Sequence, residues 1–227
     1  MRMSPVSIIT TSDASKSLLH TGLNESYHSY YGALSESQLV FLSYGFHYQA
    51  SQLQTKTIRI LEYGFGTGLN ALLVLKHSIG MQIYYTALEL YPVNWELIRQ
   101  LHYTTAVEAE EFDAVFREMH LSEWDQPVQL TPNFCLLKRK MDFKAFQAEP
   151  SHIDLIFFDA FSPDKQPELW SEEVFGQACQ ALRKGGVLVT YSSKGWVKQN
   201  LRKCGFKIER LPGPKGKRHV LRAVKPV

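Results

Sequence analysis

Apolar runs and amphipathic segments alternate along most of the chain after residue 53. Short runs rich in β-branched and aromatic residues predict strands. One of them, Ile153–Phe158 (IDLIFF), is apolar almost throughout, as in a strand covered on both faces. The seven predicted strands are Ile58–Tyr63, Ile83–Leu90, Phe134–Leu137, Ile153–Phe158, Val187–Tyr191, Phe206–Leu211 and His219–Val224. Helical periodicity predicts helices over Leu69–His77, Pro92–Leu101, Ala106–His120, Glu168–Leu182 and Lys194–Lys203.

The order of these elements indicates the fold class. Strands that alternate with helices favour a mostly parallel sheet with helices on both faces. The last two strands are joined only by the turn Pro212–Gly216, which favours an antiparallel hairpin over a crossover. The sequence therefore predicts an α/β fold of the Rossmann-like class I methyltransferase type, with a mostly parallel seven-stranded sheet that ends in an antiparallel hairpin.

Residues 1–52 do not follow this alternation. A Ser/Thr-rich stretch is followed by Ala33–Tyr48, whose pattern is typical of a helix. We expect residues 1–52 to form a small N-terminal extension, a hairpin and a helix laid over the sheet. Residues 53–227 are expected to form the Rossmann-like domain.

Charge is distributed unevenly along the chain, although a net charge of +3 and 44% hydrophobic residues are ordinary for a globular protein. The 45 residues from Arg183 to Val227 contain 13 Lys or Arg and one acid, Glu209, so they carry +12. Residues 1–182 carry −9. This asymmetry indicates a polyanionic partner at the C-terminal end.

Several classes of protein lack support in the sequence. The longest apolar runs, such as Ala71–Leu75, are far too short to cross a bilayer, and no signal peptide is expected in residues 1–13. The eight histidines show no paired spacing of metal ligands, and the three cysteines fit no disulfide framework or zinc motif. We therefore expect a cytoplasmic protein without a metal or membrane partner, whose thiols are free and mostly buried.

A glycine-rich loop follows the first predicted strand, within Leu61–Asn70 (LEYGFGTGLN). Its glycines permit a tight turn and let backbone N–H groups approach a ligand. Gly64, Gly66 and Gly68 are spaced GxGxG, and Leu69 stands where a GxGxxG dinucleotide fingerprint needs its third glycine. The loop therefore favours S-adenosylmethionine, which has no phosphates to seat, over a nicotinamide cofactor.

Acidic and aromatic residues near the loop are candidate cofactor ligands. Glu89, at the end of the second strand, is placed to accept hydrogen bonds from ribose hydroxyls. Glu62 either faces the cofactor's ammonium group or is a buried structural acid. Asp142 either binds the adenine amino group or caps the helix that starts at Phe143. Tyr27 either folds over the cofactor or packs in the core.

Asp159 follows a buried strand at the carboxyl edge of the sheet, where ligands bind in open α/β folds. An isolated carboxylate is costly to bury, so Asp159 either forms an Asx turn or faces the substrate. Phe161 and Trp170 offer aromatic surface nearby. A carboxylate among aromatic rings suits a cationic or amine group next to a flat base.

Four stretches together resemble one known family. They are Glu25–Ser29 (ESYHS), Leu61–Asn70, Asp159–Trp170 (DAFSPDKQPELW) and Gly213–Arg218 (GPKGKR). The resemblance is to the tRNA wobble-uridine methyltransferases, namely the free-standing MnmD enzymes and the methyltransferase half of the bifunctional MnmC enzymes. It implies an enzyme that transfers a methyl group from S-adenosylmethionine to the amine of 5-aminomethyl-(2-thio)uridine at the wobble position of tRNA.

The resemblance also implies residue roles and limits. It implies cofactor contacts by Thr67 and Asn70 and a substrate contact by Lys165. It covers the methyltransferase half alone, so neither FAD nor an oxidase domain is expected. The chain departs from the family at Ala14, where glycine is usual, at Gln166, where asparagine is usual, and at His219-Val220, where Glu-Met is usual.

Asp159 is the expected catalytic residue and is also expected to contact the cofactor. Methyl transfer from a sulfonium is an in-line displacement that needs a neutral amine close to the methyl carbon, and positioning supplies much of the acceleration. A carboxylate there stabilises the positive charge that develops on the nitrogen. We therefore expect Asp159 mainly to orient the amine and stabilise charge, with proton acceptance secondary.

Three other functions stay open: a polyamine-type aminopropyltransferase, a small-molecule amine methyltransferase and a non-catalytic RNA-binding module. The glycine loop lacks the acid of the GGGDG-like loop that is usual in the first. The basic C-terminal end disfavours the second. The third is disfavoured because the glycines, Glu89 and Asp159 are all present.

The basic C-terminal residues are either a solvated face or a phosphate-binding surface. With tRNA implied as the partner of a monomeric enzyme, a rim of cations around the Asp159 pocket is the better interpretation. We expect this basic rim to consist of Lys194, Lys198, Lys215, Lys217 and Arg218.

Overall fold

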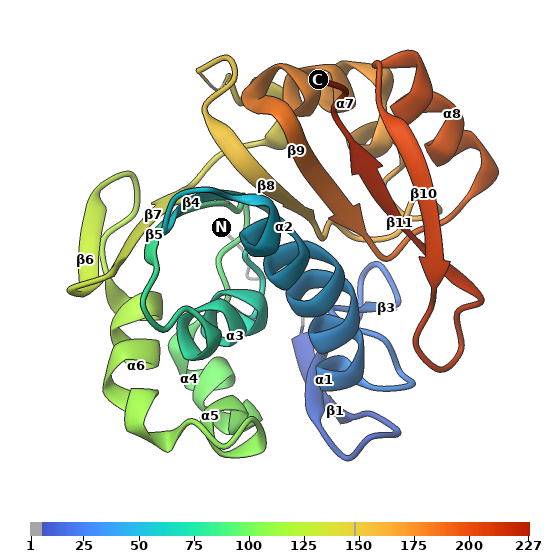
Figure 1. The fold of residues 1–227 in the computed structure, drawn as a ribbon. Helices are drawn as coiled ribbons and strands as arrows, with labels where there is room; N and C mark the ends of the chain where they lie inside the picture. The colour runs from blue at the N-terminus through green and yellow to red at the C-terminus, as the bar shows by residue number, and fades with distance from the viewer. Residues whose placement is uncertain (1–5, 148) are drawn as a thin grey trace.

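The structure, a computed structural model, describes residues 6–147 and 149–227. Residues 1–5 of the expected extension, and with them part of the segment in which no signal peptide is expected, lie outside the described residues. A mostly parallel sheet forms the centre of the molecule (Figure 1). Its strands run in the order β10 (Lys207–Pro212), β11 (His219–Val224), β9 (Leu182–Thr190), β8 (Ile153–Phe158), β4 (Thr57–Tyr63), β5 (Gln82–Leu88), β7 (Phe134–Arg139) and β6 (Pro127–Thr131).

The pairing of these strands confirms the predicted α/β fold. Strands β7, β5, β4, β8 and β9 are parallel to one another. Strand β11 pairs antiparallel with β9, and β10 pairs antiparallel with β11, so the sheet ends in the expected hairpin. Parallel strands bring their carboxyl ends to one edge of the sheet, which is where the candidate site residues of β4, β5 and β8 meet.

The number of strands corrects the prediction, because the sheet has eight rather than seven. The additional strand is β6 (PVQLT), which pairs only with β7 at the edge of the sheet. It begins with Pro127, and proline is confined to edges because it cannot donate to a sheet ladder. The segment has no apolar run, and its alternation of Val128 and Leu130 with Gln129 and Thr131 is short.

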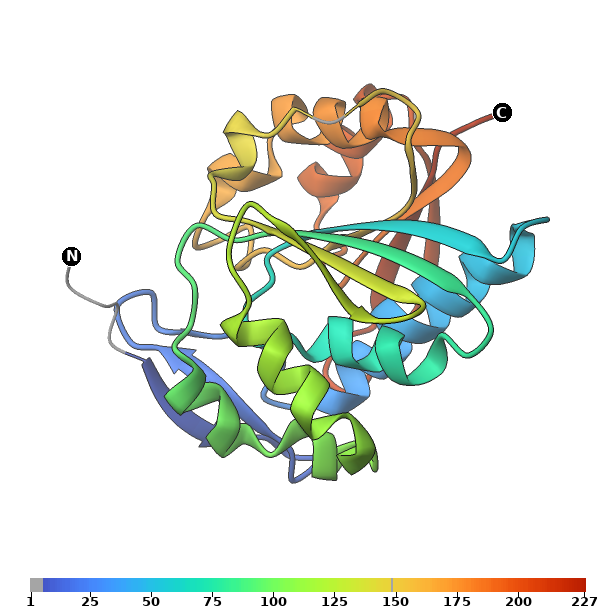
Figure 2. The same cartoon turned by 90° about the vertical axis from the view of Figure 1, so that its left-hand side faces the viewer.

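Helices cover both faces of the sheet (Figure 2). One face carries α7 (Glu172–Ala181) and α8 (Gly195–Lys203), and the other carries α3 (Leu69–His77), α4 (Trp95–Ile98), α5 (Tyr103–Ala106) and α6 (Asp113–Leu121). Successive residues of β8 enter alternate cores: Leu155 and Phe157 pack on the α3 side, and Ile156 and Phe158 pack against α7. Both faces of β8 are therefore buried, which explains its unbroken apolar sequence.

Two predicted helices are shorter than expected because local backbone features divide them. The segment Ala106–His120 was predicted as one helix, but a turn separates α5 from α6. Within that turn Glu108 takes a φ of 52°, a left-handed conformation that a helix cannot contain. The segment Pro92–Leu101 becomes helical only at α4, where the Asn94 side chain accepts a hydrogen bond from the backbone N–H of Glu96.

The predicted helix Glu168–Leu182 starts later and ends differently. Pro167–Trp170 forms a separate 3-10 turn, and Ser171 caps α7 by accepting from the N–H of Val174. Gly185 and Gly186, which follow the predicted helix in the sequence, lie inside β9.

The described part of the N-terminal extension is a three-stranded antiparallel sheet rather than a hairpin. Its strands are β1 (Val6–Thr10), β2 (Lys16–His20) and β3 (Glu25–Ser26). A continuous helix follows, made of α1 (Ala33–Glu36), the π-helical segment Ser37–His47 and α2 (Tyr48–Gln52).

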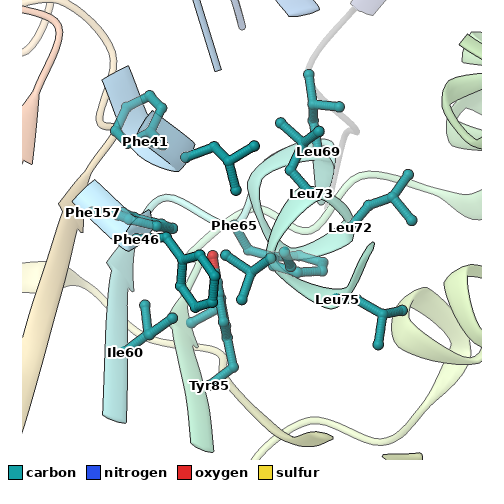
Figure 3. Packing of buried hydrophobic residues seen from close by; sticks show 14 of the residues in the cluster. Phe41, Phe46, Ile60, Phe65, Leu69, Leu72, Leu73, Leu75, Tyr85 and Phe157 are labelled. Carbon is teal, nitrogen blue, oxygen red and sulfur yellow. The ribbon is translucent and has the colours of Figure 1, made fainter. Parts of the chain in front are cut away.

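This N-terminal helix packs directly on the central sheet. A Cβ at Gly45 would lie 2.9 Å from the side chains of both Phe157 and Val189, so glycine allows a close approach there. Phe41 and Phe46 join the same core as Phe157 (Figure 3). The helix and the sheet therefore share one hydrophobic core.

Two expectations about chain class meet the structure here. Within the described ranges, no helix combines the length and apolar character needed to cross a membrane. The three cysteines (Cys135, Cys179 and Cys204) are free, as expected, but each is half-buried rather than mostly buried.

Candidate cofactor and substrate site

A cavity of about 1420 Å³ opens at the carboxyl ends of β4, β5 and β8. The glycine loop, the loop after Glu89 and the loop after Asp159 form its floor, and the N-terminal segment 23–31 forms part of its wall. Tyr191 and Lys217 close it from the C-terminal part of the chain. Stretches that are far apart in the sequence thus meet around one space.

The glycine loop has the tight geometry that its sequence predicts. Gly64, Gly66 and Gly68 have φ values of 95°, 49° and 73°, which favour glycine. A Cβ at Gly64 would lie 2.6 Å from the backbone oxygen of Asp159, so a side chain there would separate two strand ends. Gly64 and Gly66 line the cavity, whereas a Cβ at Gly68 would point at His120 on α6.

Glu89 is held beside this loop by two backbone amides. Its Oε2 accepts the N–H of Gly66 at 3.1 Å, and its Oε1 accepts the N–H of Tyr91 at 2.8 Å. Burial raises the pKa of Glu89, and these N–H donors oppose that rise. Each oxygen keeps acceptor capacity for a further donor, and the side chain lines the cavity.

Asn70 connects two carboxyl groups at the start of α3. Its Nδ2 donates to Glu62 at 2.9 Å and to Asp159 at 2.9 Å. Glu62 is buried and does not line the cavity, so the structure places it as a buried structural acid. Burial raises the pKa of Glu62 well above its usual value. Asn70 itself lines the cavity, and its buried Oδ1 has no hydrogen-bond partner among the described residues.

Asp159 is half-buried and faces the cavity. Burial and, to a smaller extent, the nearby charge of Glu36 raise the pKa of its carboxyl group to about 8. The hydrogen bond from Asn70 and the charge of Lys217 act in the opposite direction. Asp159 is therefore poised to change protonation state close to neutral pH.

Aromatic rings stand beside Asp159, although not the pair that the sequence suggests. Phe161 lines the cavity and packs edge-to-face with Tyr27, with ring centroids 5.0 Å apart. Trp170 is fully buried, packs against Phe158 and donates its indole N–H to the carbonyl of Phe161. The expectation that Trp170 offers surface to a substrate is wrong, since it supports Phe161 from within the core.

Three further expectations concern residues that line the cavity, namely Asp142, Lys165 and Tyr27. The Asp142 side chain accepts the N–H of Lys144 at 2.9 Å, so it caps the short turn Phe143–Ala145 while also lining the cavity. Lys165 is exposed and lines the cavity. Tyr27 also lines it, with its ring 3.2 Å from the position a Cβ would take at Gly66.

Hydrogen bonds link the N-terminal segment to the glycine loop and to the loop after Asp159. The Nε2 of buried His28 lies 2.7 Å from the hydroxyl of Thr67 in the glycine loop. Burial and, to a smaller extent, the charge of Lys217 lower the pKa of His28 to about 4, so the ring is neutral. The Glu25 carboxylate accepts the N–H and the hydroxyl of Ser162, at 2.7 and 2.8 Å.

Glu36 and Lys217 form a pair that the sequence analysis missed. Buried Glu36, on α1, is ion-paired with Lys217, in the turn of the β10–β11 hairpin. The Lys217 ammonium group also lies 4.0 Å from the ring centroid of Tyr191, whose hydroxyl donates to the carbonyl of Ala160 at 2.8 Å. Through Tyr191, the pair is connected to Ala160, the residue next to Asp159. No local pattern in the sequence predicts this pair.

The expected basic rim is only partly free for a ligand. Lys217 is half-buried in its ion pair, and Lys194 is paired with Asp164. Within the described ranges, neither Lys215 nor Arg218 forms an ion pair, and both are exposed; Lys198, on α8, also has no carboxylate partner there. The exposed members, Lys215 and Arg218, thus lie at the hairpin turn.

A sequence model of S-adenosyl-L-methionine-dependent methyltransferases matches residues 87–226. The chain belongs to this family. The bifunctional MnmC protein of Dichelobacter nodosus is 28% identical over 171 residues, which cover 73% of this chain and 28% of that protein. The bifunctional MnmC protein of Methylobacillus flagellatus is 30% identical over 215 residues, covering 86% of this chain and 32% of that protein. The chain thus spans about a third or less of these curated relatives.

Solved structures agree with the family assignment. The structure of MnmC2 from Aquifex aeolicus matches with a TM-score of 0.74 and 27% identity, over 98% of this chain and 71% of that one. Spermidine synthase from Thermotoga maritima shares the fold, with a TM-score of 0.52, 14% identity and coverage of 100% and 75%. The resemblance of the four sequence stretches to the MnmC and MnmD methyltransferases is therefore confirmed.

The residues around the cavity fit the cofactor of this family. The unpaired Oδ1 of Asn70 is an acceptor for an ammonium group, and Glu89 is an acceptor for hydroxyl groups. Gly66 leaves space between its backbone and the Tyr27 ring that a side chain would fill. No group of three or more His, Cys, Asp or Glu side chains that could hold a metal occurs in residues 6–147 and 149–227.

Proposed function

We propose that the chain methylates the primary amine of 5-aminomethyl-(2-thio)uridine at the tRNA wobble position, with S-adenosylmethionine as methyl donor. The observation that carries the proposal is the position of Asp159. Its carboxyl group faces a cavity walled by Phe161, Tyr27 and Tyr191, directly across the Gly64 contact from the glycine loop. The bifunctional relatives are named for the biosynthesis of tRNA 5-methylaminomethyl-2-thiouridine, which is the product of such a reaction.

In this proposal one set of residues holds the cofactor, which supplies a methyl group on a positively charged sulfur when it is bound. Glu89 accepts hydrogen bonds from the ribose, and Asp142 accepts from the adenine amino group with the acceptor capacity left by its cap. The backbone of the glycine loop is held in place by Glu89 and by the contact of His28 with Thr67. The other residues that contact the cofactor in this proposal are Tyr27, Gly64, Gly66, Thr67 and Asn70.

Asp159 prepares the substrate amine. A primary alkylamine has a pKa near that of lysine, about 10.4, and reaches the site as an ammonium ion. Methyl transfer requires the nitrogen lone pair, so a proton has to leave first. A carboxyl group whose pKa is raised to about 8 is a far better acceptor for that proton than an exposed aspartate. The structure therefore gives proton acceptance more weight than the sequence does, alongside stabilisation of the charge that develops on nitrogen.

Phe161 and the rings around it give the substrate base a flat apolar surface. The Tyr27 ring packs edge-to-face against Phe161, and the Trp170 indole donates a hydrogen bond to the Phe161 carbonyl. Unstacked bases bind to aromatic side chains in this way in single-stranded RNA. Lys165, at the same rim, is placed to contact a phosphate of the tRNA.

The decisive experiment uses S-adenosylmethionine with a labelled methyl group and three acceptors: aminomethyl-bearing tRNA, the same tRNA without the aminomethyl group, and a polyamine. We expect label only in the first. An aminopropyltransferase would label no acceptor, because aminopropyl transfer needs a decarboxylated donor and the methyl group would stay on the sulfur. Methylation of the polyamine would favour a small-molecule methyltransferase. Label in neither tRNA, with the cofactor shown to bind, would contradict the proposal.

A further inference from the structure

Three exposed tyrosines surround the mouth of the cavity. Tyr30, Tyr31 and Tyr91 all line it, and their exposed fractions are 52%, 51% and 56%. Large aromatic side chains are usually buried, so three of them around one opening mark a surface for a partner. None of the three side chains has a role in cofactor binding or in the proton transfer proposed above.

Tyr31 is the most firmly placed of the three because a glycine lies against its ring. A Cβ at Gly216 would overlap the Tyr31 ring, so only a residue without a side chain allows this contact. Gly216 has a φ of 85° and lies in the β10–β11 turn, which descends beside the N-terminal sheet (Figure 1). One side of the ring is thus covered by backbone, while half of the side chain stays open to solvent.

Two exposed cations lie in the same turn as Gly216. Lys215 and Arg218 flank the Gly216-Lys217 pair and are exposed. Desolvation, and then the charges of Arg210, Arg218 and Lys198, lower the pKa of His219. These three cations therefore lie near the same side chain. Within the described residues no ion pair neutralises Arg210, Arg218 or Lys198.

We propose that Tyr31, seated on Gly216, is a stacking platform for an unpaired nucleobase next to the reacting one, with Lys215 and Arg218 binding the phosphates beside it. The inference deepens the proposed function and rests on it for the identity of the RNA. An aromatic face bordered by cations is the combination that single-stranded nucleic acids recognise. A basic surface alone would attract any polyanion, but the exposed ring adds an interaction that only a flat base can use.

The test measures binding to an unmodified anticodon stem-loop RNA, which needs no aminomethyl group. In fluorescence anisotropy, Tyr31→Ala should raise the dissociation constant roughly 5- to 100-fold, as expected for the loss of one stacked base. Tyr31→Phe keeps the ring and should bind within about twofold of the wild type. Tyr84→Ala is the matched control, because Tyr84 is 44% exposed but does not line the cavity.

A glycine pair provides a second, independent readout. Gly216→Ala places a Cβ in the Tyr31 ring, whereas Gly80→Ala puts one at a similar φ of 75° with nothing within 4 Å. Both changes strain the backbone, but only Gly216→Ala should weaken RNA binding. Lys215→Met and Arg218→Met should each lower the slope of log affinity against log salt by about 0.7.

The outcomes separate this proposal from the proposed function. Unchanged RNA affinity in both Tyr31→Ala and Gly216→Ala overturns the platform, even if aminomethyl tRNA is methylated. If RNA affinity were unchanged and heparin also displaced the RNA equally well from all variants, charge alone would account for RNA binding. Tyr31-dependent RNA binding without methylation of aminomethyl tRNA supports the platform and contradicts the proposed function.

Discussion

Glu89 beside the glycine loop and Asp159 beyond it are two of the carboxyl groups that line the cavity, and their surroundings differ. Both oxygens of Glu89 accept backbone N–H groups, so this carboxylate is fixed in place and its charge is supported by the chain itself. Asp159 accepts one side-chain hydrogen bond, from Asn70, and lies between the opposite charges of Glu36 and Lys217. In the proposed function, Glu89 holds the cofactor and Asp159 changes its protonation state.

The largest effect should follow from Asp159→Asn. The amide cannot accept the amine proton, so we expect single-turnover methyl transfer with saturating tRNA and cofactor to fall roughly 100- to 10,000-fold. Cofactor affinity, measured by calorimetry, should change little. Near-normal turnover would show that Asp159 neither takes the proton nor stabilises the transition state.

The stability of this variant gives a control with a definite sign. The pKa of Asp159 is raised from 3.8 to about 8 in the folded protein, so its contribution to stability is complete below pH 4 and is lost as pH rises through 8. Asp159→Asn removes that loss. Its thermal unfolding temperature relative to the wild type should therefore rise between pH 6 and pH 9, and a fall would indicate a disrupted fold.

Glu89→Gln should have the next largest effect, on binding rather than on chemistry. The glutamine NH₂ group would face the N–H of either Gly66 or Tyr91, so that backbone N–H would lose its acceptor. We expect cofactor affinity to fall roughly 10- to 100-fold, the value of a hydrogen bond to a charged group. Glu96→Gln is the matched control, because Glu96 lines the same cavity but is exposed and paired with Arg99.

Single-turnover rates at saturating cofactor should show the contrast between the two acids. Glu89→Gln should recover most of its rate once cofactor is saturating, whereas Asp159→Asn should not. If saturation rescued both variants or neither, the division of the cavity into a holding acid and a titrating acid would be wrong.

The same contrast separates what the sequence could predict from what it could not. The glycine spacing and Glu89 follow directly from strands whose apolar runs are unmistakable, so the holding part of the site could be predicted from local pattern. The surroundings of Asp159 could not, because they depend on contacts between distant segments. Glu36 and Lys217 are 181 residues apart, and neither has a neighbouring residue type that marks the pairing.

Trp170 shows a different limit of sequence reading. The residue follows Asp159 and Phe161 closely, and an aromatic residue near a ligand loop suggests a binding surface. The backbone turn at Pro167–Trp170 instead directs the indole into the core beside α7. The direction of a side chain from a loop depends on backbone conformation, which the spacing of residue types does not record.

Charge changes around Asp159 should move the pH profile without removing activity. Glu36 raises the pKa of Asp159, so Glu36→Gln should shift the acid limb of single-turnover rates to lower pH. Lys217→Met should shift it to higher pH. A relative change of roughly 2- to 10-fold between pH 7 and pH 9 is the expected size, since one pH unit corresponds to a factor of 10.

Lys198→Met is the control for these two variants, because it removes a cation from α8 without touching the Glu36–Lys217 pair. Its pH profile should match that of the wild type even if tRNA affinity falls. Parallel shifts in the same direction for Glu36→Gln and Lys217→Met would contradict an electrostatic role, since the two charges have opposite signs.

The smallest effect on activity is expected from Trp170→Phe, which tests how the substrate side of the cavity is supported. The indole is fully buried and its N–H donates to the carbonyl of Phe161, so the variant loses packing and leaves that carbonyl without this donor. Denaturant unfolding should show a loss of about 1 to 3 kcal/mol in stability. The Michaelis constant for tRNA should stay within about twofold of the wild type, because a core residue touches no substrate. A large rise in that constant with unchanged stability would return Trp170 to the substrate surface, and with it the aromatic surroundings that the sequence first suggested for Asp159.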